Sequence, residues 1–216
     1  MNEQTTYDTS TGQMPMAVMP TQHPKSFVYS TERAPEIIKK KVDILPIYNE
    51  HNPLLLKRVP EVDFSNPPKD LEELADRLIA TMNHYGGAGL AANQCGVMCR
   101  MFVMAGGIVV INPTILEMSE ETVREKEGCL TFPGLTLPVN RAKTVKVSFL
   151  GVNGQKQEVT YSGITSRVFQ HEYDHLEGKV YTSKVGSLTL QMAKKKKQKL
   201  FKKMQRIVEY KQRMRG

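Results

Sequence analysis

The chain has 216 residues, of which 40% are hydrophobic, and its formal net charge is +8. It is long enough to bury a sizeable core, and no apolar run approaches the roughly 20 residues that a membrane-spanning helix requires. The cysteines number three, and no secretory signal is visible. An odd count in such a chain favours a reducing compartment, so we expect a cytoplasmic protein without disulfides and with no transmembrane segment.

Residues 1–42 form a segment rich in Thr, Gln, Met and Pro that shows no sustained hydrophobic period. They lack the positively charged start and apolar block of a secretory signal. Their acidic residues and single arginine, Arg33, also argue against an organelle transit peptide. We therefore predict a flexible N-terminal extension, followed by a folded domain over residues 43–185.

The folded domain begins with a predicted helix, because apolar residues recur at helical spacing from Leu71 to Met82. Asn153-Gly154 is typical of a hairpin turn between two later strands. The predicted strands are Met101–Met104, Ile108–Ile111, Val145–Leu150 and Glu158–Tyr161. This order predicts an α+β fold in which antiparallel strands pack around a central helix that follows them in the chain.

That later helix carries the most informative motif, His171-Glu172-Tyr173-Asp174-His175. Ser162-Gly163 can begin the helix, and Gly178 follows where a helix end favours a left-handed residue. Two histidines four residues apart project from one helix face, so both can bind one divalent metal. Glu172 points toward the same site without being a ligand, where a general base would lie. The sequence thus predicts a metal-binding helix.

A catalytic metal of this kind needs a third protein ligand and one open position. Downstream, Tyr181 stands where a third histidine would be, Glu177 is too close, and Glu209 lies among lysines. The ligand is therefore expected upstream, where the candidates are Cys95, Cys99 and Cys129. We interpret Cys95 and Cys99 as ordinary buried or half-buried thiols, because no further Cys or His clusters near them.

A glycine-rich segment runs from Gly86 to Gln94. It lacks the Gly-Lys-Ser/Thr ending of a phosphate-binding loop. Glycines also allow a peptide or ligand backbone to approach the chain closely. Gln94 could then direct its side-chain amide into the site.

In this order, the three segments resemble the motifs of the peptide deformylase family. Gly87–Gln94 is similar to Gly-x-Gly-Leu-Ala-Ala-x-Gln, Glu127–Thr131 to Glu-Gly-Cys-Leu-Ser, and His171–His175 to the His-Glu-x-x-His motif. The resemblance covers roughly residues 43–185, which we take as the catalytic domain. Thr131 replaces the usual serine but keeps a hydroxyl, so we expect activity to survive.

The resemblance implies a hydrolase that removes the formyl group from formyl-methionyl nascent peptides and releases formate. Glu172 would be the general base on a metal-bound water. The Gln94 amide and the Leu130 backbone N–H would stabilise the developing oxyanion. Family members generally use Fe²⁺, although Zn²⁺, Ni²⁺ or Co²⁺ can occupy the site. The implied metal ligands are Cys129, His171 and His175, with water in the fourth position.

Substrate selection is expected from the same helix. Ile164 and Val168 share the face of His171 and, with Ala88 and Leu130, could line a pocket for an unbranched methionine side chain. Plain core packing is the alternative for Ile164 and Val168. Arg167 is expected at the pocket rim or in an ion pair. The peptide backbone would bind extended, as an added strand beside Gly87, Ala88 and Gly89.

The C-terminal segment 186–216 is strongly basic. From Met192 to Gly216 there are 11 Lys or Arg and one acid, a local charge of +10, so the rest of the chain sums to −2. Apolar residues between Leu200 and Val208 recur at helical spacing, which predicts an amphipathic helix whose stripe docks on the domain. The resemblance implies docking on ribosomal RNA, and an anionic membrane surface is the rival. The candidate contacts are Lys194, Lys195, Lys196, Lys197, Lys199, Lys202, Lys203 and Arg206.

Two other functions remain open. One is a metallopeptidase that cleaves internal peptide bonds, which the missing downstream ligands and the glutamine motif disfavour. The other is an RNA-binding protein with a vestigial site, which the complete set of ligands, base and oxyanion donors disfavours. We expect a monomer.

Overall fold

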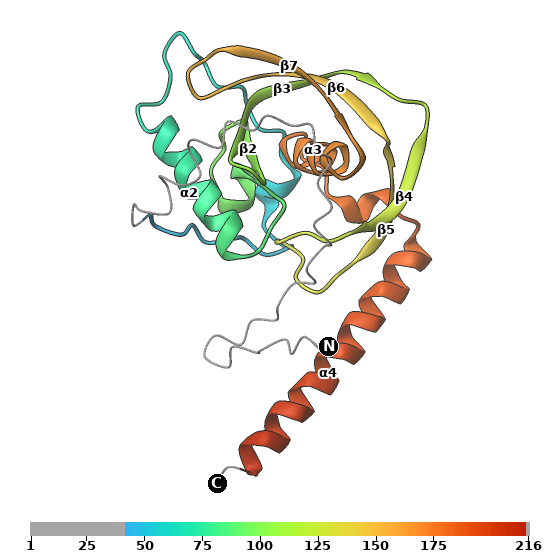
Figure 1. The fold of residues 1–216 in the computed structure, drawn as a ribbon. Coiled ribbons are helices and arrows are strands. Elements are labelled where there is room, and N and C mark those ends of the chain that lie inside the picture. The colour runs from blue at the N-terminus through green and yellow to red at the C-terminus, as the bar shows by residue number, and fades with distance from the viewer. Residues whose placement is uncertain (1–41, 215–216) are drawn as a thin grey trace, which may run out of the picture.

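The computed structural model describes residues 42–214 and contains two antiparallel sheets. The larger sheet has the strand order β1-β2-β3-β6-β7, and the smaller one pairs β4 with β5 (Figure 1). Their bounds are β1 Gly89–Ala91, β2 Met101–Met104, β3 Ile108–Met118, β4 Thr122–Glu127, β5 Leu137–Ala142, β6 Thr144–Leu150 and β7 Lys156–Ser162. The predicted extension over residues 1–42 lies, except for its last residue, outside the described chain.

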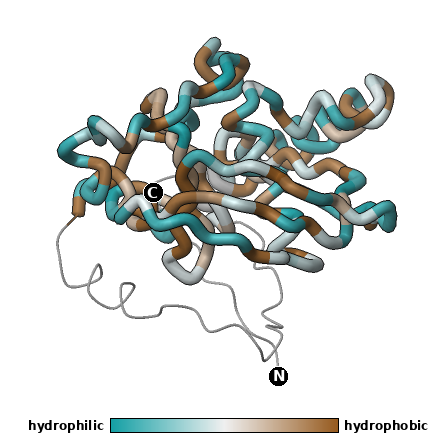
Figure 2. The backbone as a smooth tube through the Cα atoms, turned by 90° about the horizontal axis from the view of Figure 1, so that it is seen from above, coloured by the Kyte–Doolittle hydropathy of each residue, from teal (hydrophilic) through white to brown (hydrophobic). Residues whose placement is uncertain are grey.

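The four predicted strands are present, and three of them are longer than predicted. The prediction for Met101–Met104 matches β2, whereas β3 continues seven residues past Ile111. Brown and teal segments alternate along much of the tube in Figure 2, as expected for strands with one buried face. The hairpin at Asn153-Gly154 is confirmed, because β6 and β7 pair with Leu150 opposite Lys156.

Three strands escaped prediction. β1 has three residues and lies within the glycine-rich segment, whose composition is typical of loops. β4 reads Thr-Val-Arg-Glu-Lys-Glu and is mostly exposed, so it has no apolar run. β5 contains a proline, Pro138, which weakens a strand pattern. Each of the three therefore lacks a clear strand pattern in the sequence.

Helix α2 (Leu71–His84) confirms the apolar stripe, since Leu71, Ala75, Leu78, Ile79 and Met82 are all buried. Together with Leu90, Met101, Val103 and Ile111 they form the first core cluster. The helix therefore packs on the β1–β3 end of the larger sheet (Figure 1).

Helix α3 (Gly163–Leu176) lies inside the curve of the strands and contacts both sheets (Figure 1). Phe169 anchors it in a second core cluster, with its ring 5.1 Å from the ring of Phe102. Gly178 has a φ of +67°, as predicted for the helix end, and a Cβ there would come within 2.8 Å of the Leu56 backbone. The α+β fold with antiparallel sheets is confirmed.

Helix α4 (Ser187–Arg213) leaves the body and extends away from it (Figure 1). Its first turns are anchored by Leu190 and Ala193, which pack against a third core cluster that contains Cys129 and Tyr181. The predicted docking of the apolar stripe is wrong further along, where Leu200, Phe201 and Ile207 are 47%, 57% and 46% exposed. The direction of the helix explains this, because it carries those residues beyond the sheets (Figure 1). None of the described helices has the length and hydropathy needed to cross a membrane.

Candidate metal centre and active site

The two histidines of α3 and Cys129, which follows β4 closely, converge in the interior. One ligand atom from each of Cys129, His171 and His175 lies within 4.8 Å of the others, and all three residues are buried. The Cys129 Sγ and His175 Nε2 atoms are 3.3 Å apart. A thiolate with two imidazoles suits a divalent transition metal and leaves a fourth coordination position for water or substrate. The three residues therefore fit a metal ion by their chemistry and their proximity.

Glu127 determines the orientation of His171. Its Oε2 atom lies 3.0 Å from His171 Nδ1, so the imidazole donates from Nδ1 and presents Nε2 to the site. Burial would lower the pKa of His171, but its hydrogen bonds to Cys129 and Glu127 outweigh burial and raise it to about 10. These surroundings favour positive charge, which is a further reason that a cation fits between the ligands.

Glu127 is itself held by two buried arginines. Arg141 donates two hydrogen bonds, of 2.9 and 3.0 Å, and Arg167 donates one of 2.6 Å. Although burial would raise the pKa of Glu127, the hydrogen bonds from His171 and Arg141 lower it to about 2, so the carboxylate is ionised. Arg141 also pairs with Asp174, and Lys184 lies 3.1 Å from the same carboxylate. The ion pair expected for Arg167 is confirmed.

Glu172 points from α3 toward β1. A Cβ atom on Gly89 would lie 2.6 Å from Glu172 Oε1, so only glycine leaves room for this carboxylate. Glu172 Oε2 is buried and has no hydrogen-bond partner among the described residues. Burial raises the pKa of Glu172 to about 7. A carboxylate with these properties can accept and return a proton near neutral pH.

Gln94 has a fixed side-chain orientation. Its Oε1 atom accepts a 2.8 Å hydrogen bond from the Ala91 backbone N–H, so its Nε2 must face the other way. Nε2 donates to Thr131 Oγ1 at 3.1 Å and lies 3.4 Å from Cys129 Sγ. The hydroxyl of Thr131 thus has a defined partner, and the amide donor is aimed at the group of metal-ligand candidates.

A cavity of about 70 Å³ opens beside these groups. Its walls include all five predicted substrate residues, together with Leu130 and the catalytic candidates Gln94 and Glu172. Ile164 is 45% exposed at this cavity, so core packing does not explain it, whereas Val168 also packs against the second core cluster. The predicted substrate residues that line the cavity are Gly87, Ala88, Gly89, Ile164 and Val168.

The two other cysteines, and two residues without a predicted role in the site, are also placed by the structure. Cys95 is buried in the first core cluster and Cys99 is half-buried against it, which confirms the interpretation as ordinary buried or half-buried thiols; burial raises their pKa values to about 12 and 11. Tyr181 packs its ring 5.6 Å from the ring of His171. Arg141 had no predicted role, because its strand, β5, was itself not predicted.

The fold and this site define a metal-dependent hydrolase, and comparisons with known proteins specify its family. The model of the polypeptide deformylase family matches residues 44–191. Peptide deformylase of Thermotoga petrophila is 40% identical over 149 residues, which cover 67% of this chain and 89% of that protein. The chain therefore belongs to the peptide deformylase family, hydrolases that remove the formyl group from nascent peptides, and the predicted resemblance is confirmed.

Solved structures agree with this assignment. The crystal structure of peptide deformylase from Thermotoga maritima superposes with a TM-score of 0.64 at 39% identity, covering 67% of this chain and 99% of that one. A Met-Ala-Ser-bound class I type b peptide deformylase from Acinetobacter baumannii gives a TM-score of 0.63 at 31% identity, covering 66% and 99%. The family match ends at residue 191, so most of α4 lies beyond it.

Proposed function

We propose that this enzyme removes the formyl group from formyl-methionyl peptides with Glu172 as general base beside a metal held by Cys129, His171 and His175. The observation that carries the proposal is the buried Glu172 carboxylate, with one oxygen unpaired among the described residues, next to the three ligand candidates. A divalent ion in this site supplies, when bound, a water of lowered pKa and a Lewis acid for the formyl oxygen. Fe²⁺ is the proposed ion, and the soft thiolate also suits Zn²⁺, Ni²⁺ or Co²⁺.

Glu172 moves the proton in this scheme. It accepts a proton from the attacking water as the new C–O bond forms at the formyl carbon. It then returns that proton to the amine nitrogen as the C–N bond breaks, which yields formate and a free N-terminus. Its pKa of about 7 supports both transfers, because near neutral pH the carboxylate can take up a proton and the carboxylic acid can give it back.

Gln94 and Leu130 stabilise negative charge on the formyl oxygen. The Ala91 N–H fixes the Gln94 amide so that its N–H group faces the site without reorganisation. The Leu130 backbone N–H is the second donor, next in the chain to Cys129. Preorganised donors of this kind each contribute roughly 10²–10³ in rate.

The substrate binds in the cavity and along β1. The methionine side chain occupies the cavity beside Ala88, Ile164 and Val168. β1 is the edge strand of its sheet, so one side of Gly87–Gly89 can pair with an extended peptide. The Met-Ala-Ser tripeptide bound to the related Acinetobacter baumannii enzyme supports this substrate class.

The experiment compares two peptides with the enzyme loaded anaerobically with Fe²⁺. We expect formate from formyl-Met-Ala-Ser, no acetate from acetyl-Met-Ala-Ser, and no cleavage within either peptide. Internal cleavage would establish the metallopeptidase instead. An enzyme that binds metal but neither releases formate nor cleaves the peptides would contradict the proposal. It would favour the RNA-binding alternative, in which α4 carries the function.

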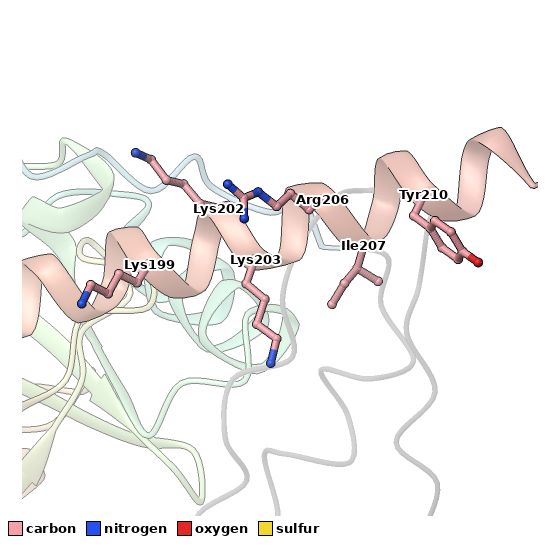
Figure 3. Close-up of a pocket in the computed structure, with 6 residues that line it drawn as sticks. All are labelled: Lys199, Lys202, Lys203, Arg206, Ile207 and Tyr210. Carbon is pink, nitrogen blue, oxygen red and sulfur yellow. The ribbon is translucent and has the colours of Figure 1, made fainter.

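We also propose that α4 docks this enzyme on ribosomal RNA, which would place a cytoplasmic monomer near emerging nascent chains. Beyond the first, anchored turns of α4, lysine and arginine side chains project from the helix, and Ile207 and Tyr210 lie near them (Figure 3). The exposed residues of the predicted contact set are Lys194, Lys195, Lys196, Lys199, Lys202, Lys203 and Arg206. Binding that neutralises several phosphates releases counterions, so affinity should fall steeply with salt.

A charge-swap variant tests this proposal. Changing Lys199, Lys202, Lys203 and Arg206 to Glu alters the charge as much as changing four exposed body lysines, at 57, 69, 126 and 179, to Glu. We expect only the α4 variant to lose sedimentation with ribosomes, while both keep deformylase activity on a free peptide. Equal sedimentation of the two variants would contradict RNA docking. Retained ribosome binding with lost binding to anionic vesicles would favour the membrane surface.

A further inference from the structure

Asn93 is a fully buried polar residue that lies between the two halves of the site. It belongs to a short 3-10 helix, η2 (Ala92–Cys95), which also carries Gln94. Its side-chain Nδ2 donates a 2.7 Å hydrogen bond to the backbone carbonyl of His175, 82 residues away in the chain. The bond joins the element that carries the amide donor directly to the helix that carries two metal-ligand candidates.

The bonded carbonyl lies in the last turn of α3, where carbonyls have no partner within the helix. Gly178 N–H also donates to His175 O, at a longer 3.2 Å. The next carbonyl, of Leu176, is held by Val59 N–H at 2.8 Å. The end of the helix is thus fixed by contacts from outside it, and Asn93 makes the contact at the metal-ligand candidate itself.

Two groups from these separate elements meet at one atom. Gln94 Nε2 lies 3.4 Å and His175 Nε2 lies 3.3 Å from Cys129 Sγ. Their relative placement depends on how η2 sits against α3, and Asn93 is adjacent in sequence to Gln94. We infer that Asn93 is a positioning residue, which holds His175 and Gln94 in the mutual geometry that metal binding and oxyanion stabilisation require.

The cost of burying this amide supports a positioning role. Asn93 Oδ1 and His175 Nδ1 are both buried and have no hydrogen-bond partner among residues 42–214. An apolar side chain of the same shape would avoid the desolvation of the amide, so packing alone does not explain asparagine here.

The inference rests on the proposed metal site, and its test separates the two. The full-length enzyme is loaded with Co²⁺, and the visible spectrum, the rate of metal release to a chelator, kcat and KM are measured. Asn93→Leu removes both polar atoms at similar volume, and Asn93→Asp removes only the donor to His175. The control is Thr81→Val on α2, because Thr81 is equally buried and bonds Leu45 N–H and Arg77 O.

We expect both Asn93 variants to release metal roughly 10- to 100-fold faster, as is typical when a group that orients a metal ligand is removed. Their Co²⁺ bands should shift, and kcat should fall more than KM changes. Thr81→Val should lose thermal stability but keep the parental spectrum, release rate and kcat. A folded Asn93 variant with parental metal release and kcat would overturn the inference. A parent enzyme that binds no metal would overturn the proposed function instead.

Discussion

Glu127 joins the metal-ligand candidates to the surrounding protein at the level of single residues. Its carboxylate receives hydrogen bonds from His171, Arg141 and Arg167, and all four groups are buried. Removing the charge of one partner from such a network leaves the others uncompensated, which is costly in a low-dielectric interior. The orientation of His171 therefore depends on an ion-pair cluster that also determines local stability.

Replacement of Glu127 by Gln should lower the free energy of unfolding by about 3 kcal/mol, since two buried arginines each lose one of their carboxylate partners. Urea denaturation of the metal-free protein measures the change. Glu121→Gln is the matched control, because Glu121 pairs with Lys143 at 3.0 Å on the surface and should cost less than about 1 kcal/mol. Equal effects of the two substitutions would show that the buried cluster contributes no more than a surface pair.

Thr131 and Gln94 allow a second prediction for single residues. Gln94→Leu should lower kcat roughly 10²–10³-fold, because it removes an oxyanion donor. Thr131→Val removes the hydroxyl that holds Gln94 Nε2 and should lower kcat about fivefold, whereas Thr131→Ser should match the parent enzyme. Steady-state formate release measures all three. A valine variant as active as the serine variant would mean that Thr131 has no part in orienting Gln94.

Motifs and long-range partners differ in how well the sequence predicts them. Cys129, His171, His175 and Glu172 follow from local spacing and family resemblance, and the structure brings them together. Asn93 and Arg141 could not be identified this way, because their partners lie 82 and up to 33 residues away. The hydrogen-bond partners of a buried polar side chain are brought to it by the fold, so the spacing of residues along the sequence does not reveal them.

The contact between β1 and α3 is the critical one at the level of secondary structure. Gly89 is the first residue of β1, and the Glu172 carboxylate occupies the space where its side chain would be. The strand therefore sets the position of the proposed base as well as presenting an edge for the peptide. The sequence predicted that the peptide would pair beside this segment, but the contact between Gly89 and Glu172 was not visible there.

Gly89→Ala should reduce kcat/KM about 100-fold, because displacing the Glu172 carboxylate by about 1 Å spoils its alignment. Gly186→Ala is the control, since a Cβ there meets nothing within 4 Å and should leave activity unchanged. Formate release and thermal unfolding are measured together, so that lost activity in a folded protein is attributed to the site. Full activity of the Gly89 variant would contradict the placement of Glu172.

The predicted elements account for the body of the molecule better than for its shape. Period-3.6 and alternating patterns identified α2, α3 and four strands, because burial on one face produces those patterns. They also identified the amphipathic character of α4, but the pattern cannot say what covers an apolar stripe. In the described structure, the first turns of α4 pack on the catalytic domain through Leu190 and Ala193, and the later turns extend beyond it.

The two parts of α4 should therefore contribute differently to whole-protein stability. A chain that ends after Ala193 retains the packed residues Val185, Leu190 and Ala193. It should melt at the same temperature as the full chain, whereas Leu190→Ala in the full chain should lose about 1–2 kcal/mol of apolar burial. Calorimetry decides this, and a large loss on truncation would mean that the exposed part of α4 stabilises the fold.

Formate release by Glu172→Ala, compared with the parent, tests the central claim most directly. Both proteins are loaded with Fe²⁺, and their metal content is measured before formyl-Met-Ala-Ser is added. We predict one metal per chain in each, formate from the parent, and at least a roughly 10²-fold lower rate in the variant, because the base is lost while the ligands remain. A variant that keeps the parental rate, or one that loses its metal, would contradict the assignment of Glu172 as a base that is not a ligand.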